Sequence, residues 1–155
     1  ASSEDKLDFA CGAGADMHIN YTTENLKDQV KKLTNDKGAD VVYDPVGGDF
    51  SEQAFRAIAW NGRFLVIGFA SGPIPKMPLN LALLKGASMV GVFWGAWSMR
   101  DPMASQTNFD ELIEMIDGNA FSPLVSQVYP LADFADAFAS IAERRAKGKV
   151  ILSMV

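Results

Sequence analysis

The chain has 155 residues, 48% of them hydrophobic and 21% charged, which is enough length and apolar content for one buried core. Its formal net charge of -5 argues against a surface that binds nucleic acid. Its single cysteine, Cys11, excludes an internal disulfide, and together with the single histidine, His18, it is too little for a structural zinc site. No apolar run approaches the roughly 20 residues of a membrane helix, and the first residues lack the basic start of a signal peptide. We therefore expect a soluble, cytoplasmic protein without a bound metal and without nucleic-acid or membrane partners.

The first expected element is an amphipathic helix over residues 4–13, with an acidic first turn and with Leu7, Ala10 and Cys11 on one face. Gly12 and Gly14 are placed to end it. Apolar spacing and turn residues then predict a strand at 18–21, a helix from 23 or 24 to 32 or 33, a strand at 39–43, a helix at 51–59 and a strand at 64–68. The last of these strands is apolar on both faces, which is typical of a parallel sheet covered by helices on both sides.

The second half of the chain continues the alternation of helices and strands. It predicts a short helix at 80–85, a strand at 88–94, a helix at 107–116, a strand at 125–129, a helix at 132–146 and a strand at 150–152. In the helix at 132–146, the inward residues are expected to be Phe134, Ala137, Phe138 and Ile141. Such alternation implies right-handed crossovers, so the predicted class is α/β with a doubly wound parallel sheet (Rossmann-like) rather than a barrel.

One segment begins like the G-x-G-x-x-G dinucleotide fingerprint but departs from it twice. After Gly12 and Gly14, the third glycine is replaced by Met17. The pair also follows a helix and precedes a strand, whereas the fingerprint follows a strand and opens a helix. We therefore interpret this segment as a helix stop and turn.

Three further features have an ordinary interpretation beside a functional one. His18, at a strand start, is expected to be a surface or edge residue rather than a ligand. Cys11 is expected to be a small core residue of its helix. The segment at 91–97 (GVFWGAW) suits a core strand followed by a turn, but it also suits contact with a ring-shaped ligand or a second subunit, and both interpretations stay open.

A series of short segments, spread over nearly the whole chain, resembles the quinone oxidoreductase-like members of the medium-chain dehydrogenase/reductase superfamily, which is alcohol dehydrogenase-like. The order and spacing of the segments carry the resemblance. They are SSEDK at 2–6, GAD at 14–16, INY at 19–21, DVVYDPVGG at 40–48, GR at 62–63, VIGFASG at 66–72 and GKV at 148–150.

This resemblance implies that Ser2, Ser3 and Lys6 hold the 2'-phosphate of NADPH, with the Tyr21 hydroxyl nearby. Physical chemistry agrees, because hydroxyls and an ammonium suit a phosphate, whereas a site that prefers NAD would place a carboxylate there for the ribose hydroxyls. The acidic residues 4 and 5 can point to solvent from the helix start while backbone amides face the anion. We therefore expect NADPH rather than NADH as the cofactor.

The resemblance also implies cofactor contacts at the ends of later strands, where open α/β sheets bind ligands. Pro45 and Val46 are expected near the adenine and its ribose, and Phe69, Ala70 and Ser71 beside the nicotinamide ribose. Phe93, Trp94 and Gly95 are expected to contact the nicotinamide through backbone groups. Arg145 is expected to reach the cofactor from the last helix. Pro45 and Val46 could instead only end a strand, and Arg145 could be a solvated surface charge.

In that family, a catalytic domain, a first strand and a glycine-rich turn precede the segments matched here. We therefore expect residues 1–155 to be a partial NADP-binding Rossmann-like domain, missing its first strand and glycine-rich turn, with residues 124–155 returning toward the catalytic domain. Such a chain would supply only the cofactor-binding part, so it is expected to hold no catalytic and no metal-binding residue. The isolated chain is then expected to be inactive.

The function implied by the resemblance is NADPH-dependent reduction of a quinone, an enone or another conjugated carbonyl by hydride transfer. The alternative is a structural or regulatory protein that binds NADPH without turnover, because a fold does not fix a function. A methyltransferase-like sheet is disfavoured, because the matched segments are not those of that group. The predicted edge strand at 88–94 is apolar and uncharged, so we also expect a homodimer through residues near 88–97.

Overall fold

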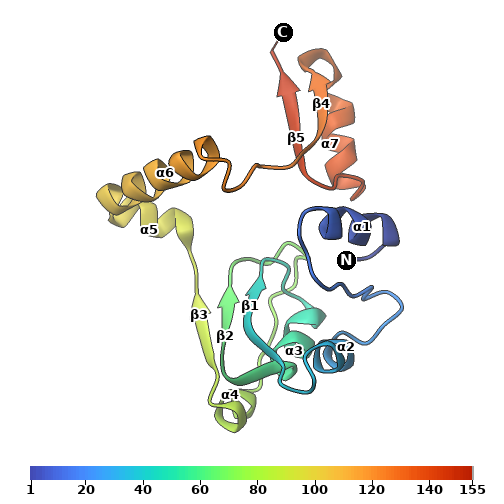
Figure 1. Ribbon diagram of the computed structural model, residues 1–155, viewed down its shortest axis with the longest axis vertical. Coiled ribbons are helices and arrows are strands. Elements are labelled where there is room, and N and C mark those ends of the chain that lie inside the picture. Colours follow the sequence, from blue (N-terminus) through green and yellow to red (C-terminus); the bar gives the residue numbers. More distant parts are fainter. Residues whose placement is uncertain (155) are drawn as a thin grey trace. The chain divides into compact units, whose positions relative to one another are not determined.

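The computed structural model describes residues 1–154, which divide after Ala96 into two compact units (Figure 1). The elements of the first unit are α1 (Glu4–Gly12), α2 (Leu26–Leu33), β1 (Ala39–Asp44), α3 (Asp49–Arg56), β2 (Ile58–Val66), α4 (Leu79–Lys85) and β3 (Ser88–Gly91). Helix α5 (Trp94–Arg100) contains the boundary between the units. The second unit holds α6 (Pro102–Asp117), β4 (Val125–Pro130), a 3-10 turn η1 (Leu131–Asp133), α7 (Phe134–Ala142) and β5 (Lys149–Ser153).

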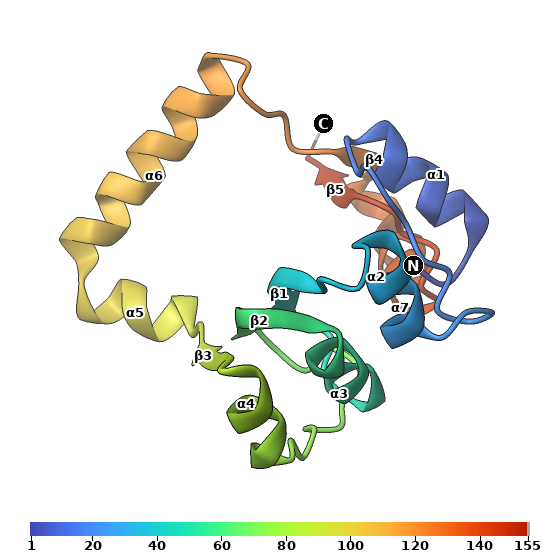
Figure 2. The same cartoon turned by 60° about the horizontal axis from the view of Figure 1, so that its bottom comes forward.

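A parallel three-stranded sheet in the order β1-β2-β3 organises the first unit. Residues 41–44 of β1 pair with 63–66 of β2, and these pair in turn with Ser88–Gly91 of β3. All three strands therefore end at the same edge of the sheet. Figure 2 shows α3 lying under β1 and β2, as expected of a crossover helix between parallel neighbours. The parallel α/β class predicted from the sequence is confirmed.

The core of this unit lies between the sheet and the helices that follow β1 and β2. Its buried cluster consists of Phe55, Ile58, Phe64 and Leu81. The rings of Phe55 and Phe64 meet edge to face with their centroids 5.6 Å apart, an arrangement that aromatic pairs prefer. Neither ring exposes more than 2% of its surface, so α3 is fixed against β2 mainly by these two side chains.

Helix α2 has a side-chain cap that sets its first residue. The Asn25 side chain accepts a hydrogen bond from the Asp28 N–H at 3.0 Å, which satisfies one of the free amides of the first turn. The helix therefore begins at Leu26, later than the expected start at residue 23 or 24. The other helices of the unit also lie close to their predicted ranges.

The predicted strand at residues 18–21 is wrong, because none of these residues belongs to a strand. A strand requires a series of bonds to a neighbouring backbone. Within residues 1–154 the only such partner is Ala1, whose amino group donates to the Ile19 carbonyl at 2.8 Å and whose carbonyl accepts from the Tyr21 N–H at 3.2 Å. The segment is thus held against the first residue of the chain, but it is not part of the sheet.

Cys11 was also expected in the core and is instead exposed. Of the three residues predicted to share the inner face of α1, only Leu7 is buried. The Cys11 Sγ lies 3.2 Å from the His18 Nδ1, so the thiol faces the turn after the helix. The cause is the position of Cys11 in the last turn of α1, beyond the residue that packs inward.

The strand predicted at 88–94 is shorter than expected, because β3 ends at Gly91 and a helix begins at Trp94. Strand β2 differs in the other direction. It begins at Ile58 and ends at Val66, with a register irregularity opposite residues 39–41 of β1 and a positive φ of 58° at Asn61. Helix α3 accordingly ends at Arg56, earlier than the predicted residue 59.

The second unit contains a parallel pair of strands, β4 and β5, with α7 as the connecting helix. Figure 1 shows α7 alongside the two strands. Of the four side chains predicted to face inward from this helix, Ala137 is buried, whereas Phe134, Phe138 and Ile141 each expose more than half of their surface. The apolar spacing therefore predicted a helix that is present but shorter than the expected 132–146, and it misjudged how much of the apolar face the described residues cover.

Candidate functional site

Two loops lie side by side where β1 and β2 end, joined by backbone hydrogen bonds. The Ala70 N–H donates to the Pro45 carbonyl at 3.0 Å, and the next N–H, that of Ser71, donates to the Val46 carbonyl at 2.9 Å. Two groups of sequence-predicted site residues, Pro45 with Val46 and residues 69–71, are thus brought together. They line the edge where a parallel α/β sheet binds its ligands.

The last residue of β1, Asp44, holds the first of these loops. Its Oδ1 accepts hydrogen bonds from the N–H groups of Val46 and Gly47, both at 2.9 Å. Its Oδ2 accepts from the Ser51 hydroxyl at 2.6 Å, and Ser51 is 1% exposed. The backbone carbonyl of Asp44 also accepts from the Ile67 N–H at 3.0 Å, at the end of β2.

Glycine is required at two positions where the loops touch. Gly47 has a φ of 72°, and a Cβ there would lie 2.9 Å from the Phe69 Cδ1. Gly48 has a φ of 64°, and a Cβ there would lie 2.7 Å from the Ser71 Oγ. A larger residue at either position would strain the backbone and press on a side chain of the second loop, so the Gly47-Gly48 pair permits the close approach of the loops.

An apolar groove of about 370 Å³ follows at the ends of β2 and β3. Residues 66–69 form one wall and residues 91–93 the other. The Val92 N–H donates to the Val66 carbonyl at 2.9 Å, which fixes the two walls to each other. Phe69 and Phe93 are 39% and 77% exposed, so their rings are available to a flat ligand. Trp94, which was expected at the end of a strand, and Gly95, which was expected just past it, lie instead in the first turn of α5.

The predicted phosphate-binding residues lie at the start of the chain. Ser3 is the N-cap of α1 in an extended conformation, and Lys6 follows in the first turn. The hydrogen bond between Ala1 and Tyr21 places Tyr21 beside residues 1–3. The Glu4 carboxylate accepts a hydrogen bond from the Asn20 side chain at 2.7 Å, so its charge is engaged within the chain.

Tyr21 also links this end of the site to the first loop. Its ring lies 4.6 Å, centroid to centroid, from the ring of Phe50, which is in the first turn of α3 shortly after Gly48. The side chain predicted to lie near a phosphate is therefore packed against the helix that follows the Gly47-Gly48 pair. The first unit thus contains all the predicted site residues except Arg145.

Arg145 lies in the second unit, after α7. Its guanidinium donates to the Glu143 carboxylate at 2.7 Å, and this bond raises the pKa of the arginine further above its usual value. Arg145 also lines a small hollow of about 190 Å³ with Ser126, Gln127 and Lys147. It is a fully charged surface arginine.

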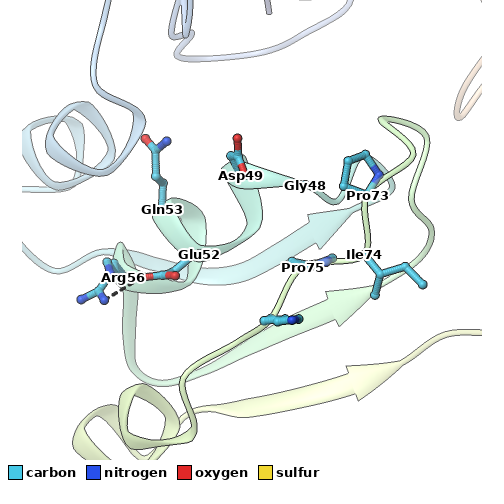
Figure 3. A pocket seen from close by; sticks show the side chains of 9 residues that line it. Gly48, Asp49, Glu52, Gln53, Arg56, Pro73, Ile74 and Pro75 are labelled. Atoms are coloured by element: carbon cyan, nitrogen blue, oxygen red, sulfur yellow. Dashed lines mark hydrogen bonds and ion pairs between the residues drawn. The ribbon is translucent and has the colours of Figure 1, made fainter.

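A second groove of about 370 Å³ lies between α3, together with its N-cap Gly48, and residues 73–76. Figure 3 shows Pro73 next to Gly48, where the Gly48 N–H donates to the Pro73 carbonyl at 3.1 Å. The Glu52 and Arg56 side chains, joined by a 2.6 Å ion pair, extend along α3 on one wall. The charges of this groove are therefore partly satisfied within α3.

Within residues 1–154, no group of three or more histidine, cysteine, aspartate or glutamate side chains could hold a metal ion. Cys11 and His18 make only a pair, so the described residues do not fit a zinc site. None of the described helices combines the length and the apolar character needed to cross a bilayer.

Comparison with known proteins identifies the family. The family model described as zinc-binding dehydrogenase matches residues 13–152. The chain belongs to this family. Among curated relatives, the quinone oxidoreductase-like protein 2 homolog of Nematostella vectensis is 41% identical over 99% of the chain, and the quinone oxidoreductase of Pseudomonas aeruginosa is 32% identical over 97%. The chain spans 42% and 46%, respectively, of the length of these two relatives.

Solved structures show the same fold. A quinone oxidoreductase from Pseudomonas syringae superposes with a TM-score of 0.84 at 30% identity, over 98% of this chain and 47% of that one. A mycobacterial protein complexed with NADPH gives a TM-score of 0.85 at 26% identity, over 98% and 48%. An NAD-dependent alcohol dehydrogenase gives 0.84 at 33% identity, over 100% and 43%. The chain thus has the Rossmann-like fold of the medium-chain dehydrogenase/reductase enzymes.

The residues that hold the two loops of the site in their conformation were not identified from the sequence. Asp44, Gly47, Gly48 and Ser51 were not among the predicted site residues, although three of them lie in the matched segment at 40–48. The signal that could have found them is an aspartate that ends a strand, followed within four residues by two glycines. An aspartate in that position often accepts hydrogen bonds from the backbone of the turn that follows.

Proposed function

We propose that this chain is the cofactor-binding part of an NADPH-dependent oxidoreductase that reduces quinones or other conjugated carbonyls. The observation that carries the proposal is the pair of joined loops and the apolar groove at one edge of a parallel sheet. Membership of the family, and the quinone oxidoreductase names of several relatives, support the same activity. The bound cofactor would supply the chemistry, which is hydride transfer from the nicotinamide to an electron-poor carbon of the substrate.

The choice of NADPH over NADH rests on the start of α1. Ser2 and Ser3 offer hydroxyls and Lys6 an ammonium, the groups that bind a phosphate dianion best. The amides at the N-terminus of α1 add a positive electrostatic field. Tyr21, packed against the first turn of α3, would present its hydroxyl on the same side.

The two loops and the groove would hold the rest of the cofactor. The loop of Pro45 and Val46 would pack near the adenosine, and residues 69–71 would lie beside the nicotinamide ribose. The groove walls formed by Phe69 and Phe93 would exclude water from the nicotinamide, with Trp94 and Gly95 beyond. No residue of this chain is assigned as an acid, base or nucleophile.

Replacement of Lys6 tests this assignment. In the full-length protein, Lys6→Ala should weaken NADPH binding by about 1.5 to 3 kcal/mol, roughly 10-fold to 150-fold, because a charge-assisted contact is lost. Binding of NADH should change little, because NADH has no 2'-phosphate. The matched control is Lys32→Ala, which removes an exposed lysine of α2 outside the site and should leave both affinities unchanged.

The affinities are best measured by fluorescence titration of each reduced cofactor, with quinone-dependent oxidation followed in parallel. An equal loss for the two cofactors would show that Lys6 does not contact the phosphate. Tight binding of NADPH without oxidation by any quinone or enone would support the structural or regulatory alternative instead.

A further inference from the structure

The turn of the first loop is held by the carboxylate of Asp44, a residue that is not itself a proposed cofactor contact, and the second loop is bonded to the backbone of that turn. Asp44 accepts hydrogen bonds from five donors of its own chain: three through its side chain, and the Ile67 and Gly68 N–H groups through its backbone carbonyl. It is the last residue of β1, where a carboxylate would ordinarily be available to a ligand. Its oxygens are instead turned inward, toward the loop and α3.

The orientation of the loop follows from these bonds. Because the N–H groups of Val46 and Gly47 point toward the Asp44 side chain, they are held on the inner side of the turn. The carbonyls of Pro45 and Val46 are meanwhile engaged by the second loop, which contains Ala70 and Ser71. The inner edge of the turn is thus bound to Asp44, and its outer edge is bound to the neighbouring loop.

The bond from Ser51 extends this arrangement to the helix. Ser51 is in the first turn of α3, is almost fully buried, and donates to the Asp44 Oδ2 at 2.6 Å. A short bond to a carboxylate in a partly buried place is among the stronger hydrogen bonds. The β1 end, the turn at 45–48 and the start of α3 therefore move together, and the loop at 69–71 is attached to them.

We propose that Asp44 is a positioning residue for the cofactor, which sets the relative place of the loop near the adenosine and the loop near the nicotinamide ribose. This inference rests on the proposed function. Asp44 would not touch the cofactor. It would act by holding the turn at 45–48 in the place that one extended dinucleotide requires. The loss of its carboxylate would release this turn, and the second loop, which is bonded to the carbonyls of Pro45 and Val46, would shift with it.

The test compares Asp44→Ala with Asp44→Asn in the full-length protein. Alanine removes all three side-chain acceptor bonds. Asparagine keeps an oxygen for the Val46 and Gly47 N–H groups, and its amide can donate to the Ser51 hydroxyl, which can turn to accept. We expect Asp44→Ala to weaken NADPH and NADH alike by about tenfold to a hundredfold, as is typical when binding groups are displaced by about 1 Å. The Asp44→Asn variant should stay close to the parent.

A control separates positioning from loss of stability. Leu81→Ala removes a core side chain from α4, outside both loops, and should lower stability without a change in cofactor affinity. An Asp44→Ala protein that binds both cofactors as the parent does would overturn the inference. So would a Leu81→Ala protein that loses as much affinity as the Asp44→Ala variant.

If Asp44→Ala does not fold, Ser51→Ala decides the matter, because it removes only one of the three bonds. A loss of affinity of the same kind for both cofactors, smaller than tenfold, would support the inference, whereas an unchanged affinity would overturn it. Failure of the proposed function has a different signature. The parent protein itself would then bind neither NADPH nor NADH, and the Lys6 and Asp44 variants could show no loss of cofactor affinity.

Discussion

Gly38, the residue before β1, is predicted to be the least replaceable glycine of the first unit. Its φ is 86°, so an alanine there costs roughly 1–2 kcal/mol in backbone conformation alone. Its new Cβ would also lie 2.5 Å from the Ala57 carbonyl oxygen and 2.9 Å from the Ala59 nitrogen. Both are backbone atoms where β2 begins, so they cannot move aside as a side chain would, and the overpacking adds roughly 1–3 kcal/mol. The total for Gly38→Ala is about 2–5 kcal/mol.

The matched control is Gly14→Ala, which has the same conformational cost without the collision. Gly14 has a φ of 102°, and a Cβ added there would meet nothing within 4 Å, so its replacement should cost only about 1–2 kcal/mol. Urea denaturation of the two variants and the parent, compared at a common slope, gives the difference directly. Equal free energies of unfolding for the two variants would refute the close approach of Gly38 to β2.

Two further predictions concern the core and the sheet edge. Phe55→Ala should lower the free energy of unfolding by about 3–5 kcal/mol, because it empties a fully buried site and removes the edge-to-face contact with the Phe64 ring. Phe55→Leu should lower it much less, and calorimetry of the two variants measures the difference. We also propose that β3, an edge strand of the described sheet, pairs with its copy in a homodimer through residues near 88–97. Val90→Lys should then give a monomer in sedimentation, and an unchanged dimer or a monomeric parent would contradict this proposal.

The sequence predicted the elements whose pattern is strong and local. The β-branched run at 39–43 and the apolar run from Phe64 became adjacent parallel strands, because such residues are stable in a sheet covered by helices. The segment at 18–21 was predicted as a strand too, and it forms none. The two cases differ because a strand needs a neighbouring strand to pair with, and the local sequence shows only that a segment could pair.

The same reasoning explains the errors at the helices. Spacing along residues 132–146 identified the apolar face of α7, but only Ala137 on that face is covered by the described residues. Spacing shows that a face is apolar without showing what covers it. At residues 92–95, two aromatic side chains favoured a longer strand, whereas the chain turns after Gly91 and begins a helix at Trp94, a boundary with no strong local signal.

In the candidate site, the family resemblance identified residues expected to contact a ligand but not the residues that hold the ligand-binding loops in position. Val46 was chosen from the sequence as a residue near a ligand, yet the structure uses its backbone, which donates to Asp44 on one side and accepts from Ser71 on the other. The Val46 side chain takes no part in these bonds. The shape of the loop therefore depends on the carboxylate of Asp44 and on the absence of a Cβ at Gly47 and Gly48, which are chemical properties of three residues that need never touch a ligand. Because the Val46 backbone is held by the Asp44 side chain as well as by the Ser71 backbone, part of the requirement on sequence at this edge of the sheet falls on residues that need not contact a ligand.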